Sequence, residues 1–415
     1  MSNRPAEVAP DLVLASGHLG DGRLVDLHVV DGSVSAVTES GTPVAAGTPR
    51  EDLAGWLLLG AMAEPHAHLD KALTAEQVPN PRGDLMGAID AWMTAASNGL
   101  FTPEDIADRA TDALELLLAN GATAVRTHVN VGAGVEAVRA VREARSRMDG
   151  LLDVQIVALT SNPITGPEGR ENRRALAAAL EVGVDLIGGC PHLDPDGTTL
   201  MSDAFAAASD AGIGLDLHVD EVLDPEVLYL RELALMVSES GFAHPVTASH
   251  CVTLGLQSPE VQAAVSRQVA DAGVSVVTLP QTNLFLQGRN HPTATPRGLT
   301  AMAALHQAGA LVCAGADNVQ DPFNLVGRSD PLETAALLVM AGHRLPDEAF
   351  RMIGANARAC LGLPSAGPVV GAVADLVAID APSVRGAIAD APMARKVFHR
   401  GKLVAATSQS RTIYR

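Results

Sequence analysis

The sequence predicts an α/β protein: a (β/α)8 barrel with a small discontinuous β-sandwich domain formed by the N- and C-terminal segments. Two observations carry this prediction. The middle of the chain alternates eight short apolar runs with longer helical patterns, and both ends consist of short β-branched segments broken by Gly, Pro and Asp. Continuous apolar runs that alternate with helices are typical of a parallel sheet covered on both faces, and eight such units can close into a barrel.

The predicted domains follow one another along the chain. Residues 1–55 form the first part of the β-sandwich, residues 56–365 form the barrel, and residues 366–415 complete the β-sandwich. The apolar runs of the barrel lie at 56–64, 122–131, 153–160, 184–190, 213–221, 245–251, 274–280 and 310–317. Helices are expected between them, near 103–119, 134–147, 171–182, 200–211, 226–240, 258–272, 298–308 and 330–341.

Local signals support these helices. Thr102 and Ser258 each stand directly before a proline and a glutamate, which is the pattern of an N-cap residue followed by proline at the first helical position. Several helical patterns end in glycine, as expected at a helix C-terminus. An open doubly wound sheet is the alternative fold. Eight strands are many for that fold, and the polar residues described next favour the barrel.

Composition narrows the class of protein. The 415 residues include 29 Lys and Arg against 48 Asp and Glu, a net charge of −19, so nucleic acid and anionic membranes are not expected partners. The four cysteines are far apart, which favours a reducing compartment. No signal peptide is evident, and the longest apolar run is about half the ~20 residues that a membrane span needs. We therefore expect a cytoplasmic protein; a homo-oligomer is left open.

Polar, metal-capable side chains follow most of the apolar runs. His66 and His68 are two residues apart, so in an extended segment both imidazoles point the same way. His218, His250 and Asp317 stand at the ends of later runs, and barrel enzymes carry their chemistry at these C-terminal strand ends. Histidine nitrogens with a carboxylate suit Zn²⁺ or Fe²⁺ and leave a position for water. The sequence thus predicts one divalent metal ion.

Two further patterns bear on the chemistry. Glu221 lies three residues after His218, where a carboxylate can serve as the proton shuttle of metal-assisted hydrolysis. The stretch 132–137 has the spacing of a dinucleotide-binding turn. However, the nearest suitable acid, Asp153, begins a strand instead of ending one, so a tight βα turn explains this stretch better.

Together these residues resemble the amidohydrolase superfamily, and within it the bacterial cytosine deaminase group. The stretches that carry the superfamily resemblance are EPHAHLDK (64–71), HVDE (218–221), TASH (247–250) and GADN (315–318). The stretches NLFLQGR (283–289) and DPF (321–323) are similar to those of the cytosine deaminase group. The resemblance extends over nearly the whole chain, including the β segments at both ends.

The resemblance implies a role for each matching residue. The residues implied as metal ligands are His66, His68, His218 and Asp317. His250 would hydrogen-bond the attacking water, Asp317 would accept its proton, and Glu221 would protonate a ring nitrogen of the substrate. A binuclear member would hold a carbamylated lysine, and Lys71 follows His68 too closely for that position. We therefore expect a mononuclear site.

The sequence departs from cytosine deaminase where that enzyme holds its substrate. Ser161 stands in place of a glutamine, Asn318 in place of an aspartate, and Phe323 in place of a tryptophan. The Asp-Asn pair and the HLDK stretch are similar to N-isopropylammelide hydrolases instead. Together with Gln287, these residues are expected to line the substrate pocket. Because Asn318 can donate as well as accept hydrogen bonds, cytosine is expected to be a poor substrate.

The sequence favours a metal-dependent hydrolytic deaminase. Its expected substrate is an amino- or alkylamino-substituted nitrogen heterocycle, either a cytosine-like pyrimidine or an s-triazine. A cyclic-amide hydrolase using the same metal site is the alternative, and the product distinguishes the two, because only the deaminase leaves the ring intact. A non-catalytic binding protein is the least favoured function, since no predicted ligand or proton shuttle is missing.

Overall fold

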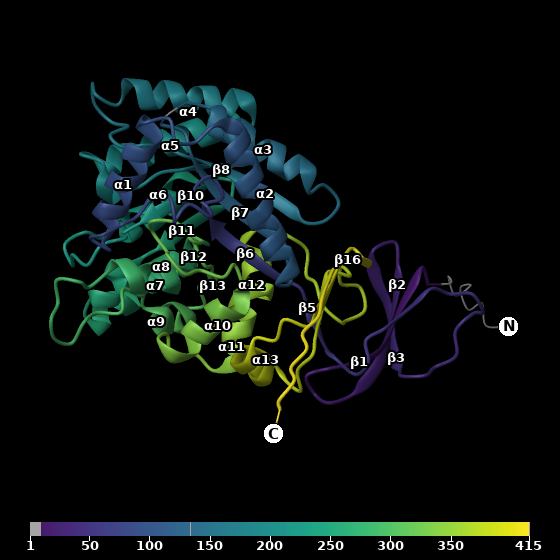
Figure 1. Cartoon of the computed structure of the whole chain (residues 1–415). Helices are drawn as coiled ribbons and strands as arrows, with labels where there is room; N and C mark the ends of the chain where they lie inside the picture. Colours follow the sequence, from purple (N-terminus) through teal and green to yellow (C-terminus); the bar gives the residue numbers. More distant parts are fainter. Residues whose placement is uncertain (1–9, 133, 415) are drawn as a thin grey trace.

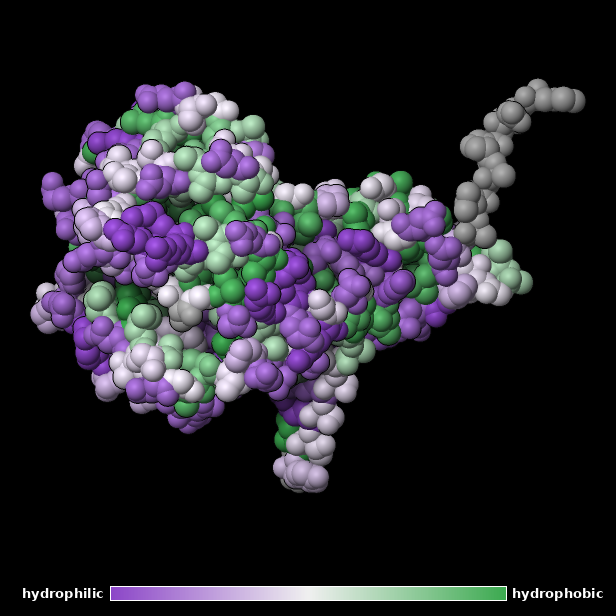
Figure 2. Space-filling model, turned by 90° about the horizontal axis from the view of Figure 1, so that it is seen from above, coloured by the Kyte–Doolittle hydropathy of each residue, from purple (hydrophilic) through white to green (hydrophobic). Residues whose placement is uncertain are grey.

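The computed structural model describes residues 10–132 and 134–414. Residues 1–9 and 415 of the predicted β-sandwich, and Ala133 of the predicted βα turn, lie outside these ranges. Figure 1 shows a helix-covered barrel joined to a separate sheet, and Figure 2 shows the sheet as a narrower projection beside the larger lobe, with hydrophilic and hydrophobic residues interspersed on the face seen.

The barrel consists of eight strands that are all parallel to their neighbours and follow one another in chain order. They are β6 (Met62–Ala67), β7 (Ala122–Asn130), β8 (Asp153–Leu159), β9 (Leu186–Gly188), β10 (Gly214–Val219), β11 (Val246–His250), β12 (Ser275–Thr278) and β13 (Val312–Ala314). The first and last strands approach at Asp317, whose N–H donates to the His66 carbonyl at 3.1 Å. The predicted (β/α)8 barrel is confirmed.

Helices cover the outside of the barrel, and those the sequence predicts are present. They are α2 (Pro103–Ala119), α3 (Glu136–Arg147), α4 (Arg170–Val182), α5 (Gly197–Ala211), α6 (Tyr229–Ser240), α7 (Pro259–Asp271), α9 (Met302–Gln307) and α10 (Pro331–Met340). The predicted N-caps also form: the Thr102 hydroxyl accepts from the Asp105 N–H at 3.2 Å, and the Ser258 hydroxyl accepts from the Val261 N–H at 3.4 Å. Local sequence thus sets where these helices begin.

The structure also contains helical segments that the sequence analysis did not predict. They are α1 (Leu85–Ser97), α8 (Pro280–Leu286), α11 (Pro346–Ile353), α12 (Ala355–Cys360), α13 (Val384–Asp390) and the 3₁₀ turns Pro191–Leu193 and Val252–Leu256. Among them, α1 stands between β6 and α2 as an addition to the regular alternation. Its start is capped by Asp84, whose carboxylate accepts from the Gly87 N–H at 2.6 Å.

The two ends of the chain form one mixed sheet. Its strands are β1 (Leu12–His18), β2 (Leu24–Val30), β3 (Ser33–Glu39), β4 (Arg50–Asp52), β5 (Leu57–Gly60), β14 (Leu376–Ile379), β15 (Arg395–His399) and β16 (Lys402–Thr407). β5 pairs antiparallel with β14, which joins the N-terminal strands to the C-terminal ones. The predicted discontinuous β domain is therefore present, while the domain boundaries at 55/56 and 365/366 stay a prediction.

The first apolar run, 56–64, was expected to be one barrel strand, and it contributes to two sheets instead. Its first half is β5 of the terminal sheet, and its second half begins β6 of the barrel. The chain passes so close to the segment after α12 at Gly60 that an added Cβ would lie 2.8 Å from the Ala366 carbonyl oxygen. Both halves are mostly apolar and contain fully buried residues, so hydrophobicity alone could not reveal the division.

The main apolar core lies between the barrel strands and their helices. It includes the fully buried Ile156, Ile187, Leu215 and Ala248 of successive strands. None of the helices in the described ranges combines the length and apolar composition that a bilayer crossing requires.

Candidate active site

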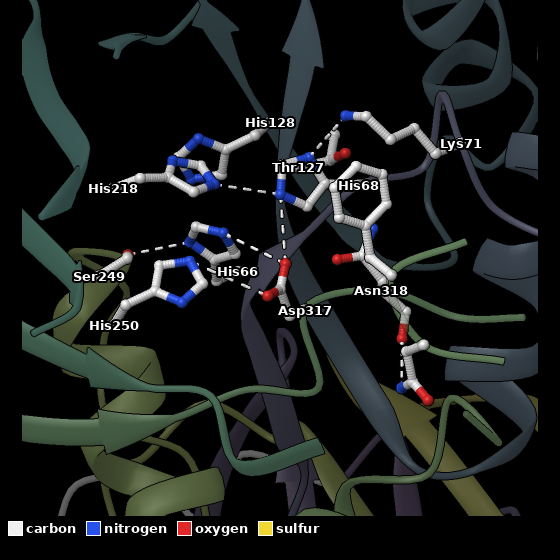
Figure 3. A network of polar contacts seen from close by, with 12 residues as sticks. His66, His68, Lys71, Thr127, His128, His218, Ser249, His250, Asp317 and Asn318 are labelled. Atoms are coloured by element: carbon white, nitrogen blue, oxygen red, sulfur yellow. Dashed lines mark hydrogen bonds and ion pairs between the residues drawn. The ribbon is translucent and has the colours of Figure 1, made fainter. Parts of the chain in front are cut away.

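Predicted site residues converge at the C-terminal ends of the barrel strands. His66 lies on β6 and His68 directly after it, His218 lies on β10, His250 ends β11, and Asp317 follows β13. Figure 3 shows these imidazoles together with that of His128, and dashed lines join His66, His68 and His250 to the Asp317 carboxylate. The carboxyl ends of the strands in a closed parallel barrel meet at one face, so residues as far apart in the sequence as His66 and Asp317 become neighbours.

The ligand atoms of this group point at a common centre. His68 Nε2 lies 3.2 Å from His218 Nε2 and 3.2 Å from Asp317 Oδ1, and His66 Nε2 lies 3.6 Å from Asp317 Oδ1. His66 Nε2 and Asp317 Oδ1 have no hydrogen-bond partner among the described residues. Buried polar atoms ordinarily find partners, so this convergence fits a bound cation.

The protonation state of the histidines also fits a metal. Burial holds the pKa values of His66, His68 and His218 well below their ordinary value of 6.5. The imidazoles are therefore neutral at physiological pH, and the neutral form is the one that binds metal ions. Nitrogen and carboxylate ligands in this number suit a divalent transition metal.

A chain of hydrogen bonds fixes the orientation of His66. Its Nδ1 donates to the Ser249 hydroxyl at 2.9 Å, and that hydroxyl donates to Asp216 Oδ1 at 2.9 Å. The other oxygen of Asp216 accepts from the Arg126 guanidinium at 2.9 Å. The imidazole of His128 stacks on His66 with its ring centre 4.0 Å away. These contacts occupy Nδ1 and leave Nε2 facing the site.

The segment that carries His68 is tied to its surroundings on both sides. The Leu69 N–H donates to the Thr127 hydroxyl at 3.0 Å, and the Asn130 N–H donates to Asp70 at 3.1 Å. Lys71 Nζ lies 3.1 Å from His68 Nδ1 on the side of the ring away from the site centre. The backbone after β6 is thus attached to β7, which holds His68 in place.

Glu64 links the first and last barrel strands beneath the site. Its carboxylate accepts from the His66 N–H at 3.1 Å and from the Ala316 N–H at 3.0 Å. Burial raises the pKa of Glu64 to about 8. One partner is the backbone of His66, and the other is the backbone of Ala316, the residue before Asp317. Glu64 therefore sets the spacing between His66 and Asp317.

Glu221 and His250 lie beside the ligand group. His250 Nδ1 donates to Asn283 Oδ1 at 3.0 Å, and its Nε2 lies 3.9 Å from Asp317 Oδ2. Glu221 Oε1 lies 3.6 Å from His250 Nδ1, and burial raises the Glu221 pKa well above 4.5. Burial thus favours the protonated form of Glu221, the form that can donate a proton.

The backbone at the site is strained. His250 has φ of 71° and Asp317 has φ of 67°, both in the left-handed region that residues other than glycine rarely adopt. Such conformations cost on the order of 1–3 kcal/mol each and concentrate at functional sites. His250 is the last residue of β11, and Asp317 lies three residues after the end of β13.

A cavity of about 340 Å³ opens above these residues. Its lining includes Ser161, Asn318 and Phe323 of the predicted substrate pocket. Gln287 lies outside this lining, behind Glu221, whose backbone carbonyl accepts from the Gln287 amide at 3.1 Å. The structure thus places three of the four predicted pocket residues around the cavity and the fourth against the back of Glu221.

The polar pocket residues are already engaged within the protein. The Ser161 hydroxyl donates to Asn130 Oδ1 at 3.0 Å, and the Asn318 amide donates to Asp321 Oδ2 at 2.6 Å. One hydrogen of the Asn318 amide is therefore used by Asp321 and is not available to a ligand. These contacts fix the direction in which each side chain meets the cavity.

Sequence reasoning missed two contributors to the cavity. Lys71 is buried, lines the cavity, and places its Nζ 5.8 Å from the ring centre of Trp92 and 5.9 Å from that of Phe323. Its position at the end of the HLDK stretch was the available signal. Helix α1 contributes an apolar wall, and the signal there was the Asp84 cap before a run of apolar residues.

Comparisons with known proteins agree with this geometry. The model of the Amidohydrolase family matches residues 81–405. A pterin deaminase from Rhizobium rhizogenes is 32% identical over 387 residues, which cover 91% of this chain and 87% of that protein.

Two solved structures are similar along almost the full chain. A 5-methylcytosine deaminase from Klebsiella pneumoniae, liganded with 5-fluorocytosine, superposes with a TM-score of 0.87 at 28% identity, covering 97% of this chain and 99% of that one. An N-isopropylammelide isopropylaminohydrolase from Burkholderia multivorans gives a TM-score of 0.82 at 28% identity, covering 95% and 98%. The resemblance found in the sequence is confirmed.

Proposed function

Because this chain belongs to the amidohydrolase family, we propose that it is a metal-dependent deaminase that hydrolyses an exocyclic C–N bond of an aminated nitrogen heterocycle. The relatives above are named for action on pterin, 5-methylcytosine and N-isopropylammelide. One observation carries the proposal: buried imidazole and carboxylate atoms converge beside Glu221, whose pKa is raised by burial, at the floor of a ligand-sized cavity. The pterin deaminase is the relative of higher sequence identity among these, so a pterin-like ring leads the candidates.

The residues proposed to hold one divalent ion, zinc or iron, are His66, His68, His218 and Asp317. A divalent ion bound there would supply a water nucleophile at neutral pH. The unpartnered His66 Nε2 and Asp317 Oδ1 support this assignment, as does the neutral state of the three histidines.

The protein groups beside the ligands complete the reaction. His250 donates its Nδ1 proton to Asn283, so its Nε2 can accept a hydrogen bond from the attacking water. Asp317 accepts the proton that this water loses. Glu221 donates its proton to the ring nitrogen next to the attacked carbon, which neutralises the charge that the attack would leave on the ring. The C–N bond then breaks: the amine leaves with the electron pair of that bond and with the proton held by Asp317. The hydroxyl of the intermediate becomes a carbonyl as its proton passes to Glu221, so both carboxyl groups return to their starting states.

The cavity walls are proposed to select the ring. Ser161, Asn318 and Lys71 present polar groups, and Phe323 presents an aromatic face beside Lys71. Gln287 acts on Glu221 through its backbone carbonyl instead of touching the substrate. The expectation that cytosine is a poor substrate stays a prediction, as do the cytoplasmic location and a homo-oligomeric state.

The test assays a panel of heterocycles as substrates and measures the metal content of the same protein preparation. The panel contains pterin, 5-methylcytosine, cytosine, aminopurines, creatinine and N-alkylated triazines. We expect amine release from one class, loss of activity on chelation, and recovery when zinc or iron is returned. Ring opening without amine release would support the cyclic-amide hydrolase instead, and no product from any compound with metal-loaded protein would contradict the proposal.

A further inference from the structure

The cavity has two chemically different parts. Residues at the strand ends form a polar floor around the ligand group, whereas α1 forms an apolar wall of Leu85, Met86, Ile89, Trp92 and Met93. We propose that this wall is a second subsite, and that the substrate carries an apolar or aromatic extension beyond the ring that is hydrolysed. This inference rests on the proposed function for the chemistry at the floor, but the subsite itself can be tested by binding alone.

Cavity size supports an extended substrate. An engineered apolar cavity of about 150 Å³ is enough to bind benzene. A single six-membered ring at the floor would therefore fill roughly half of the 340 Å³ present here. The unfilled half lies against α1, where apolar side chains give water few partners. A ligand that extends to α1 would bury this surface and gain the corresponding hydrophobic free energy.

The pattern along α1 supports a ligand-facing stripe. The five wall residues lie at helix positions i, i+1, i+4, i+7 and i+8, which form one face of a helix. Asp90, Ala91 and Thr94 lie on another face and line a separate groove outside the cavity. The wall is thus the apolar face of an amphipathic helix turned toward the active site.

The wall is both exposed and adaptable. Met86 and Met93 are 48% and 49% exposed, although large apolar side chains on one helix face are ordinarily buried against protein. Methionine is flexible and polarisable, which suits a surface that accepts apolar groups of varied shape. Two half-exposed methionines at the edge of a cavity are explained by a ligand that covers them.

Trp92 is the member of the wall that contacts within the protein hold in place. The ring of Trp92 stacks on that of Phe101 with centres 4.4 Å apart and an angle of 15° between the planes. Lys71 Nζ lies near both Trp92 and Phe323, so the charged group marks the boundary between floor and wall. An aromatic ring that is already held by the protein loses little conformational entropy on binding, which favours Trp92 as a specificity element.

The kinetic experiment compares two forms of the best ring in the panel. One is unsubstituted, and the other carries a propyl group at the ring edge remote from the amine. We expect wild type to favour the propyl compound by at least about tenfold in kcat/KM, because each methylene in an apolar pocket discriminates by about that factor. Ile89→Ala should lower kcat/KM about tenfold for the propyl compound and less than about twofold for the unsubstituted ring.

Thr94→Ala is the matched control, because it removes a β-branched side chain from the other face of the same helix. It should leave kcat/KM unchanged for both compounds. A second variant, Met93→Trp, fills the subsite and should reverse the preference of wild type. The inference is overturned if wild type prefers the unsubstituted ring. It is also overturned if Ile89→Ala, like Thr94→Ala, changes kcat/KM by the same factor for both compounds.

A binding experiment separates the subsite from the chemistry. The chain has two tryptophans, so in a Trp56→Phe background the remaining fluorescence reports Trp92. The hydrolysed propyl product should quench this fluorescence at a concentration about tenfold lower than the unsubstituted product does. If the two products quench at the same concentration, the subsite is overturned even if the enzyme releases ammonia. Preferential quenching without any ammonia release would keep the subsite and contradict the deaminase.

Discussion

Two regions of the molecule bring histidine and carboxylate side chains equally close together. At the carboxyl end of the barrel, His66, His250 and Asp317 have ligand atoms within 4.8 Å of one another. The ligand atoms of His66, His68 and His218 lie within the same distance. On the terminal-sheet side of the barrel, Asp153, Asp375 and His399 meet the same limit. Judged by residue types and spacings alone, either cluster could be a metal site.

The partners of the two clusters differ. In the cluster near the terminal sheet, Arg358 lies 3.0 Å from Asp375, and Arg400 lies 3.2 Å from Asp153. In the barrel cluster, the nearby cation, Lys71, contacts the back of His68, and His66 Nε2 finds no hydrogen-bond partner in the described part of the chain. Carboxylates that are already paired with guanidinium groups are explained as structural ion pairs, whereas buried ligand atoms with no guanidinium beside them favour the proposed metal ion.

Removing a histidine from each cluster should give the largest contrast. His68→Ala deletes a ligand that lies 3.2 Å from two others, so we expect less than about a tenth of the wild-type metal per chain, with loss of turnover. The matched variant His399→Ala should keep its metal. Elemental analysis of both proteins makes the comparison. Equal metal in His68→Ala and wild type would show that the barrel cluster is structural too.

Glu221→Gln should separate catalysis from metal binding within the barrel site. The amide keeps the size of the side chain and cannot transfer a proton, so kcat should fall by about 10²–10⁴. Metal content should match wild type, because Glu221 is not one of the proposed ligands. Steady-state kinetics and elemental analysis on one preparation test this. A metal-free or fully active variant would contradict the assigned role.

Ser249→Ala should weaken metal binding without abolishing it. The variant removes the hydrogen-bond partner of His66 Nδ1, and losses of such outer partners typically cost about 10–100-fold in metal affinity. Ser266→Ala is the control, since Ser266 is equally buried but lies on α7. Competition with a chelator gives both affinities. Equal affinities for the two variants would mean that the chain to Asp216 does not orient His66.

Asp375→Asn should have no effect on the barrel site and a clear one on stability. The variant leaves the buried Arg358 without its anionic partner, so the free energy of unfolding should fall by about 3–5 kcal/mol. Metal content and kcat per folded molecule should equal those of wild type. Denaturant unfolding measures the free energy of unfolding, and assays on folded protein measure metal content and kcat. A drop in metal content would contradict this prediction, because it would show that the two clusters depend on each other.

The sequence by itself determined the barrel and the position of its chemistry. Apolar runs alternating with helical patterns specify parallel strands, and their ends must meet at one face of a closed sheet. His66, His68 and Asp317 therefore come together for topological reasons, without knowledge of any contact. The Thr102 and Ser258 caps were predictable for a different reason, since each involves a hydrogen bond three residues away.

Only the tertiary structure decided which polar groups are partners. The contact of Ser249 with His66 joins residues 183 positions apart, and no local pattern encodes such a distance. The same holds for the division of the run 56–64 between two sheets and for the place of Gln287 behind Glu221. Whether a buried carboxylate binds an ion or an arginine depends on what packs against it, and packing is a property of the folded chain alone.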